Sequence, residues 1–386
     1  MRYDTGHHAT TEARLCVVEV LIIYNFMPAL TVDEIPSVAR MSSTNVTVEE
    51  FGKTKEGQVV SRYTLKNGNG MVVQVINFGA AITSIQVPDK AGNYDDVVLA
   101  YPTVEDYEND GFYIGEVVGR VANRIGNGKI TVNGTDYQLT VNNGPNHLHG
   151  GFKGFSRVYW DSTVEGNAVK FTYVSADGEE GYPGQLTAQV KYQLSKENEV
   201  IIHITAHCTQ ATPVNLTNHS YFNLAGHGTP DMYDHQVTIK AENYIALDEH
   251  QVPTGEIKAV QGSLYDLREP VTVGDRIHQV PGGYDNSFCL QSSKEKGQPF
   301  ARVVHPKSGR VLEAFTTQPS VHFYTGNYLE GVASCKDGKK YPKHSGLCLE
   351  TQNYPNAINR PNFPNSILQP GEMYDHTTWY KFSVLK

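Results

Sequence analysis

The sequence predicts an all-β protein, a large antiparallel β-sandwich with few short helices. From Phe51 onward, short β-patterned segments alternate with closely spaced turn signals, which is typical of antiparallel sheets packed face to face. The sequence contains no convincing amphipathic helix longer than a few turns, and Glu105 to Asn109 is a short candidate. No Pro/Ser-rich linker follows Ser43, so we expect one large domain over residues 44–386.

The expected strands follow one another along the chain, each with its own signal. Met71 to Ile76 is a β-branched run after Asn67-Gly68, a hairpin-type dipeptide, and Asn133-Gly134 separates two short strands within Lys129 to Leu139. Leu186 to Leu194 alternates apolar and polar residues at period two, which predicts a strand with one buried face. Further strands are expected at Val200 to Ala206, Val237 to Ile239 and Arg302 to Val304.

The first 43 residues differ from the rest of the chain. Leu15 to Leu30 is apolar, but Glu19 and Asn25 interrupt it, and it is too short to span a membrane. The segment before it carries little positive charge, and Met27 to Leu30 is a poor cleavage region, which disfavours a signal peptide. We therefore expect residues 1–43 to be a poorly ordered extension outside the folded domain.

Composition and charge narrow the choice of partner and compartment. The chain of 386 residues has a net charge of -9 and a pI near 5.9, which argues against nucleic acid or an anionic membrane as the main partner. Its five cysteines are widely spaced and form no C-x-x-C motif. An odd number in this arrangement suits free thiols in a reducing compartment better than a disulfide framework. We therefore expect a cytoplasmic protein.

Several motifs of cofactor and metal sites are missing from the sequence. No G-x-G-x-x-G follows a strand and opens a helix, and neither H-E-x-x-H nor G-x-S-x-G occurs. His147 and His149 could lie on one strand face as metal ligands, but no third ligand at a diagnostic spacing accompanies them. We therefore expect no metal and no cofactor.

Five polar segments interrupt the β pattern. The most informative one surrounds His219, where amides and hydroxyls interrupt apolar and aromatic residues from Asn215 to Leu224. Buried polar groups need partners, and imidazole is the side chain whose ordinary pKa allows proton transfer near neutral pH. The other segments are Gly119 to Ile125, Asn146 to Gly151, Gly283 to Phe288, and Leu347 to Asn353, in which Glu350 ends an apolar strand.

Together these segments resemble the aldose 1-epimerases, also called galactose mutarotases. The resemblance runs from about Phe51 to Lys386 and is carried by the Asn-Arg of GRVANRI, by NHLHGG and NLTNHSYFNL, by the GYD of GYDNSFCL, and by HSGLCLETQNYP. It implies a β-sandwich of the galactose-mutarotase type and an isomerase that interconverts the α and β anomers of free aldohexoses such as galactose and glucose. A monosaccharide is then the expected partner.

The resemblance also implies roles by position. The general base falls on Glu350 and the general acid on His219, which we expect to face each other across the sugar. The substrate-orienting positions are Asn123, Arg124, His149 and Asp285. His322 stands where many relatives have a glutamine, so we include it among the binding residues and expect it to affect sugar selectivity.

Mutarotation needs an acid and a base that work in both directions. A base removes the proton of the C1 hydroxyl while an acid protonates the ring oxygen, the aldehyde rotates about the C1–C2 bond, and ring closure reverses both transfers. A carboxylate paired with an imidazolium suits this chemistry because both groups exchange protons near the working pH. Tyr221 and Phe323 could stack on the apolar face of a pyranose.

Each candidate residue also has a structural alternative. His219 could be a hydrogen-bonded core histidine, Glu350 a strand-end carboxylate in an ion pair, and Asp285 a turn-capping residue. We expect Arg120 to pair with a surface acid outside the site. A glycoside hydrolase on a related sandwich and a non-catalytic sugar-binding protein are the alternative functions. A hydrolase normally needs two carboxylates, whereas the acid candidate here is a histidine.

Overall fold

The structure is a computed structural model that describes residues 44–291, 295–330, 332 and 334–385. The chain divides into two units, and the unit Ser42–Lys386 contains all of the described residues. The predicted extension, residues 1–43, lies outside the described residues.

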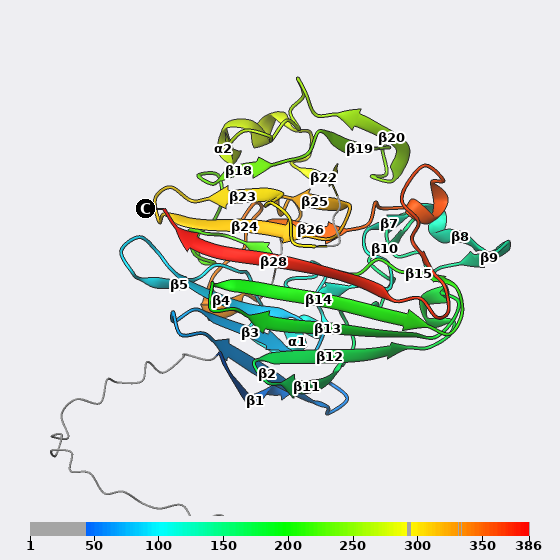
Figure 1. Ribbon diagram of the computed structural model, residues 1–386, viewed down its shortest axis with the longest axis horizontal. Helices are drawn as coiled ribbons and strands as arrows, with labels where there is room; N and C mark the ends of the chain where they lie inside the picture. The colour runs from blue at the N-terminus through cyan, green and yellow to red at the C-terminus, as the bar shows by residue number, and fades with distance from the viewer. Residues whose placement is uncertain (1–43, 292–294, 331, 333, 386) are drawn as a thin grey trace, which may run out of the picture. The chain divides into compact units, whose positions relative to one another are not determined.

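Within the described part of the chain, a nine-stranded antiparallel sheet runs across the folded unit (Figure 1). Its strands are, in spatial order, β11 (Asp161–Glu165), β12 (Ala168–Ser175), β13 (Leu186–Leu194), β14 (Glu199–Cys208), β28 (Tyr374–Val384), β24 (Arg310–Thr316), β23 (Ala301–Val304), β18 (Gln236–Ile239) and β21 (Val271–Thr272). Strand β28 pairs with β14 on one side and β24 on the other, so segments far apart in the sequence meet at the centre of the sheet.

The described residues form two further large antiparallel sheets. The five-stranded sheet contains β1 (Asn45–Lys53), β2 (Val59–Lys66), β3 (Val72–Ile76), β4 (Ile82–Pro88) and β5 (Tyr94–Asp96). The six-stranded sheet contains, in order, β17 (Tyr221–Phe222), β26 (Leu347–Gln352), β25 (Ser320–Tyr324), β22 (Asp285–Cys289), β19 (Asn243–Leu247) and β20 (Pro253–Ala259). Val73 on β3, Ile202 on β14 and Leu349 on β26 belong to one buried cluster, so the core joins all three sheets and confirms the predicted β-sandwich.

Smaller elements connect the large sheets. Two-stranded ladders pair β6 (Val117–Val118) with β16 (Thr217–Asn218), β7 (Arg124–Ile125) with β10 (His147–Leu148), β8 (Lys129–Val132) with β9 (Thr135–Gln138), and β15 (Thr212–Pro213) with β27 (Ile367–Leu368). The helices are α1 (Val104–Glu108) and α2 (Val273–Arg276), with 3-10 turns at Gly126–Gly128, Glu179–Gly181, Ile277–Gln279, Lys336–Gly338 and Ala357–Asn359. None of the helices in the described part of the chain has the length and apolar character needed to cross a bilayer.

The strands and the helix predicted from sequence are confirmed, with small shifts at their ends. Strand β13 alternates buried and half-buried residues along its whole length, as its period-two pattern indicates. Asn133 and Gly134 have φ angles of 50° and 80°, the two positive values that a type I′ hairpin turn requires. Helix α1 begins one residue before the predicted Glu105, because the Oγ of Thr103 accepts a hydrogen bond from the N–H of Asp106 and caps the first turn.

Candidate active site

Three neighbouring strands of the six-stranded sheet carry predicted functional residues. In the ladder, Ser287 on β22 pairs with His322 on β25, which in turn pairs with Glu350 on β26. Side chains alternate along a strand, so Asp285, two residues before Ser287, projects from the same face. The strand register therefore brings Asp285, His322 and Glu350 together, although they lie far apart in the sequence.

These side chains line a cavity of about 520 Å³. The volume falls within the range of about 300–1,000 Å³ that is usual for small-molecule sites. All seven of the predicted site residues line it: Asn123, Arg124, His149, His219, Asp285, His322 and Glu350. Polar groups from β7, β22, β25 and β26 and from the loops after β10 and β16 thus converge on one space.

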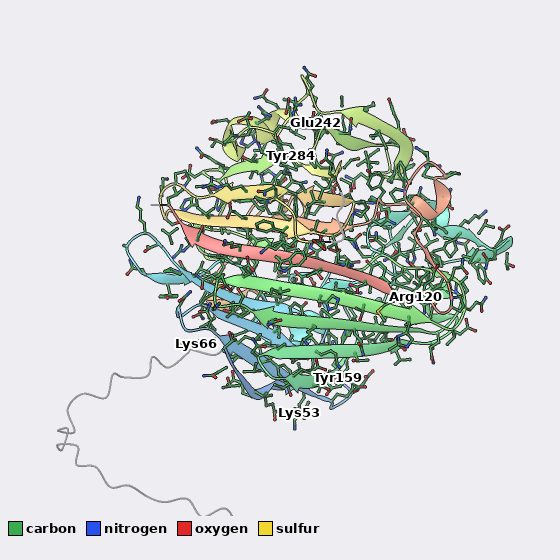
Figure 2. The ribbon with its side chains drawn as sticks, viewed as in Figure 1. Lys53, Lys66, Arg120, Tyr159, Glu242 and Tyr284 are labelled. Atoms are coloured by element: carbon green, nitrogen blue, oxygen red, sulfur yellow. The ribbon has the colours of Figure 1, made fainter. Side chains whose placement is uncertain are left out.

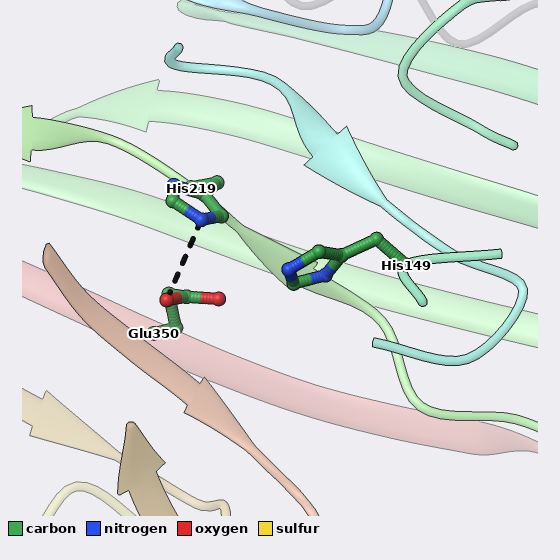
Figure 3. Close-up of side chains that lie close together, drawn as sticks. All are labelled: His149, His219 and Glu350. Carbon is green, nitrogen blue, oxygen red and sulfur yellow. Dashed lines mark ion pairs between the residues drawn. The ribbon is translucent and has the colours of Figure 1, made fainter. Parts of the chain in front are cut away.

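His219 and Glu350 lie next to each other in the wall of this cavity (Figure 3). Nε2 of His219 is 3.6 Å from Oε1 of Glu350, and the two residues are 4% and 1% exposed. We expected the pair to face each other across the sugar, but this distance places the two groups side by side. An acid and a base in this arrangement can reach two oxygens bonded to the same carbon.

The backbone of His219 and its second ring nitrogen, Nδ1, also have protein partners. The backbone N–H of His219 donates to the carbonyl of Glu116 at 2.8 Å, and the backbone carbonyl of His219 accepts from the N–H of Gly115 at 3.0 Å. Nδ1 lies 3.6 Å from the Sγ of Cys348, and burial, with the nearby carboxylate of Glu350, raises the pKa of this thiol well above its ordinary value. A neutral thiol can both donate and accept, so it is a partner for Nδ1 in either protonation state.

Glu350 retains an acceptor atom in the cavity wall. Its Oε2 is buried and accepts no hydrogen bond from any residue in the described ranges. Leaving a buried carboxylate oxygen without a donor costs free energy, and a binding or catalytic role is one explanation for such an atom. This oxygen is available to a hydroxyl group of a ligand.

His149 is fixed as a hydrogen-bond donor. Its Nδ1 accepts a hydrogen bond from the backbone N–H of Asn123 at 3.2 Å, while the backbone N–H of His149 donates to the carbonyl of Asn123 at 3.2 Å. Burial, with the positive charges of His219 and Arg124, lowers the pKa of His149 well below its ordinary value. The neutral ring therefore carries its proton on Nε2. Asn123 and His149 both have left-handed φ angles, 63° and 48°, a conformation that concentrates at functional sites.

Asp285 is held as a carboxylate by His322 and Arg124. Nε2 of His322 donates to Oδ1 of Asp285 at 2.7 Å, and Nδ1 of His322 lies 2.9 Å from Oγ of Ser287. Burial acts to raise the pKa of Asp285, but the hydrogen bond from His322 and the positive charges of His322 and Arg124 outweigh it, so the pKa lies below its ordinary value. The turn-capping alternative for Asp285 is wrong, because its side chain points to His322 and not to a turn N–H.

The residues present fit hydrogen bonding to a ligand better than metal coordination. Among the described residues, the ligand atoms of His149, His219 and Glu350 all lie within 4.8 Å of one another. A coordinating histidine must offer an unprotonated nitrogen. In His149, Nδ1 already accepts from Asn123 and Nε2 carries the proton, so this ring is set as a donor.

The aromatic residues around the cavity differ in part from those we expected. Tyr221 lines it, with its ring centroid 5.0 Å from that of His219. Phe323 does not line it, because strand alternation turns this side chain into the core, where it packs on Tyr284. Its neighbour Tyr324 lines the cavity instead.

Tyr113 is a site residue that the sequence analysis missed. Its ring lies 4.7 Å from that of His149 and 6.0 Å, stacked, from that of His219. It has a φ of 58°, which is unusual for a bulky residue. No motif surrounds Tyr113, so nothing in the sequence marks it.

Two polar residues near the motifs lie outside the cavity lining. Contrary to our expectation, Arg120 (labelled in Figure 2) forms no ion pair with an acidic residue in the described part of the chain. It is 1% exposed, and its guanidinium donates to backbone carbonyls and to the hydroxyls of Ser175 and Thr212. His147 is not a metal partner of His149, because its two nitrogens contact the carbonyl of Thr140 and the hydroxyl of Tyr182, each at 2.6 Å.

Comparison with known proteins identifies the family of the chain. The family model of aldose 1-epimerases matches residues 61–381. The chain is 52% identical over 342 residues to the galactose mutarotase of Bos taurus, covering 88% of this chain and 99% of that protein. It is 50% identical over 342 residues to the galactose mutarotase of Homo sapiens, with the same coverage. The crystal structure of an aldose epimerase homologue from C. elegans superimposes with a TM-score of 0.77 at 30% identity, covering 83% of this chain and 97% of that one. The chain therefore belongs to the aldose 1-epimerase family, and it is an isomerase that acts on carbohydrates.

Proposed function

We propose that this enzyme interconverts the α and β anomers of free aldohexoses such as galactose and glucose, with Glu350 as general base and His219 as general acid. The observation that carries the proposal is the contact between the two groups, 3.6 Å apart in the wall of a cavity of sugar size. The names of the mammalian relatives support galactose as a substrate.

Ring opening moves two protons at a single carbon. Oε2 of Glu350, which has no donor among the described residues, accepts the proton of the C1 hydroxyl. The imidazolium of His219 gives its proton to the ring oxygen, which is bonded to the same carbon. Each positioned proton transfer contributes about a hundred- to ten-thousand-fold to the rate.

Ring closure uses the same groups in reverse. After the aldehyde rotates about the C1–C2 bond, neutral His219 recovers the proton from the attacking hydroxyl, and protonated Glu350 returns its proton to the aldehyde oxygen. The Nε2–H of His149 is a donor for the ring oxygen or the nascent aldehyde. Because a hemiacetal opens over a modest barrier, these transfers need no metal and no covalent intermediate.

The remaining cavity residues bind the sugar hydroxyls. Arg124 offers donors, and Asp285, held as a carboxylate, offers acceptors. The rings of Tyr113 and Tyr221 supply apolar surface for the sugar face. Glu350 and Asp285 are two carboxylates in one cavity, as a glycoside hydrolase would need, but the acid beside Glu350 is His219.

The test follows the optical rotation of freshly dissolved α-D-galactose and α-D-glucose. We expect wild-type enzyme to bring both rapidly to anomeric equilibrium, and Glu350→Gln to lose nearly all of this activity. Glu269→Gln is the matched control, because the Glu269 side chain is 88% exposed and lies outside the cavity lining. Full activity of Glu350→Gln overturns the base assignment, and release of sugar from an aryl galactoside favours a hydrolase.

We also propose a cellular location, a domain boundary and a partner for the enzyme. A cytoplasmic location agrees with the four described cysteines, Cys208, Cys289, Cys335 and Cys348, all of which are free thiols. The match of the family model to residues 61–381 supports a single catalytic domain over residues 44–386, with residues 1–43 as an extension. A monosaccharide is the proposed partner, and the net charge of -9 argues against nucleic acid or an anionic membrane.

A further inference from the structure

The two nitrogens of His322 are both engaged with protein groups. Nε2 lies 2.7 Å from Oδ1 of Asp285, and Nδ1 lies 2.9 Å from Oγ of Ser287. An imidazole has only these two hydrogen-bonding atoms. His322 therefore has no free nitrogen for a sugar hydroxyl, although it lines the cavity, and it acts on the substrate through Asp285.

This arrangement tolerates a change of charge on His322 without a change of geometry. In the neutral ring, the Nε2–H donates to Asp285 and Nδ1 accepts the hydroxyl proton of Ser287. In the protonated ring, the Nδ1–H donates to the same hydroxyl, which can rotate because a serine oxygen both donates and accepts. His322 is 5% exposed and Ser287 is 1% exposed, so surrounding side chains hold both residues in place in either protonation state.

His322 shares the cavity with other titratable and charged groups. Besides tyrosines, those that line it are Asp285 on β22, Glu350 on β26, His219 between β16 and β17, His149 after β10, Arg124 on β7, and Glu249 and His250 at the turn after β19. Of these groups, Asp285 is the one that forms a hydrogen bond with the imidazole, whose other nitrogen contacts Ser287. Asp285 is thus the group that senses the charge of His322 most directly.

We infer that His322 is a positioning residue that makes sugar binding depend on pH, by setting how strongly the Asp285 carboxylate accepts sugar hydroxyls. This rests on the proposed function of the cavity. When His322 is neutral, Asp285 keeps its full negative charge for the sugar. When His322 is protonated, it forms an ion pair with Asp285 that partly neutralises the carboxylate, so Asp285 becomes a weaker acceptor for sugar hydroxyls.

The first test compares the pH profiles of wild-type enzyme and His322→Gln between about pH 5 and 8, where histidine titrates. A glutamine can donate to Asp285 and accept from Ser287, yet it carries no charge at any pH. We expect the wild-type KM to rise roughly three- to tenfold on acidification, the effect of weakening one hydrogen bond. The KM of His322→Gln should stay flat, while kcat changes alike in both proteins because His219 and Glu350 remain.

The second test uses wild-type protein and therefore does not depend on folding of a variant. The probe is 1,5-anhydro-D-galactitol, which lacks the C1 hydroxyl and cannot mutarotate, and the readout is the NMR signal of the His322 ring during a pH titration. If protonation weakens sugar binding, linkage requires that the sugar move the midpoint of this titration to lower pH by the same factor.

The outcomes separate this inference from the proposed function. Equal dependence of KM on pH in wild-type enzyme and His322→Gln, or a His322 titration unchanged by the saturating probe, overturns the inference. An absence of mutarotation by wild-type enzyme, with the probe still bound more weakly at low pH, overturns the proposed function and leaves the role of His322 standing.

Discussion

The two sides of the cavity are built in different ways. Asp285, His322 and Glu350 project from β22, β25 and β26, where the ladder register sets their spacing. His149 and His219 lie on short ladders and loops, and His149 is held in left-handed backbone. The strand-borne side carries the proposed base and the proposed sugar-binding carboxylate, whereas the loop-borne side carries the proposed acid and the donor His149. Regular backbone thus positions the two carboxylates and His322, and irregular backbone positions the imidazoles of His149 and His219.

Apart from the loss expected in Glu350→Gln, the largest effect should come from removing the proposed acid on the loop-borne side. We predict that His219→Asn lowers kcat about a hundred- to ten-thousand-fold, the usual contribution of a positioned proton transfer. Polarimetry with α-D-galactose measures it, and circular dichroism checks that the fold is retained. His207→Asn, at an exposed position of β14, is the control and should behave as wild type. A normal kcat in His219→Asn would mean that another group protonates the ring oxygen.

The strand-borne side should affect binding more than the chemical step. We predict that Asp285→Asn raises KM about ten- to a hundredfold, because hydrogen bonds to a charged acceptor contribute about 1.5–3 kcal/mol. The value of kcat should change far less. Michaelis profiles for galactose give both constants, with exposed Asp136→Asn as the control. A fall in kcat with unchanged KM would place Asp285 in the proton transfers instead.

Tyr113 tests whether the loop-borne side also depends on its aromatic support. We predict that Tyr113→Ala lowers kcat/KM about two- to tenfold, since aromatic ring contacts contribute about 0.5–1.5 kcal/mol beyond burial. Tyr113→Phe keeps the ring contacts with His149 and His219 and should stay near wild type. If the two variants lose activity equally, the hydroxyl of Tyr113 and not its ring is what matters.

The smallest expected effect is on stability and concerns Glu116, whose carbonyl holds the backbone of His219. Burial, followed by the charge of Asp110, raises the pKa of Glu116 well above the ordinary value of 4.5. An acid whose pKa is raised by folding stabilises the fold below its unfolded pKa, and this stability is lost as the pH rises. Glu116→Gln should therefore have a Tm about 1–2 °C above that of wild type near pH 8.

A second measurement of Glu116→Gln at low pH is the control for this prediction. Near pH 4 the difference in Tm between wild type and Glu116→Gln should shrink, because the unfolded chain then keeps its glutamate protonated as well. Differential scanning calorimetry at the two pH values measures this, with Glu269→Gln at an exposed site for comparison. A Tm difference that is the same at both pH values would show that burial of a neutral Glu116 is not the cause.

Local pattern was sufficient for the strands and for part of the site. The alternation of Leu186 to Leu194 and the Asn133-Gly134 turn predict β13 and the β8–β9 hairpin, because both signals depend only on neighbouring residues. The motifs also predicted residues that line one cavity. Phe323 and Arg120 were predicted wrongly, because the face a strand residue takes and the partners of a buried guanidinium depend on distant segments.

The sequence by itself determined the fold class, the family and which residue types could exchange protons. Only the tertiary structure decided that Glu350 and His219 lie side by side, that Tyr113 supports both imidazoles, and that His322 has both nitrogens engaged. The physical reason is the sequence separation over which each kind of interaction acts. Periodicity and turn chemistry act over a few residues, whereas the ladder that aligns Ser287, His322 and Glu350 joins strands separated by long stretches of chain.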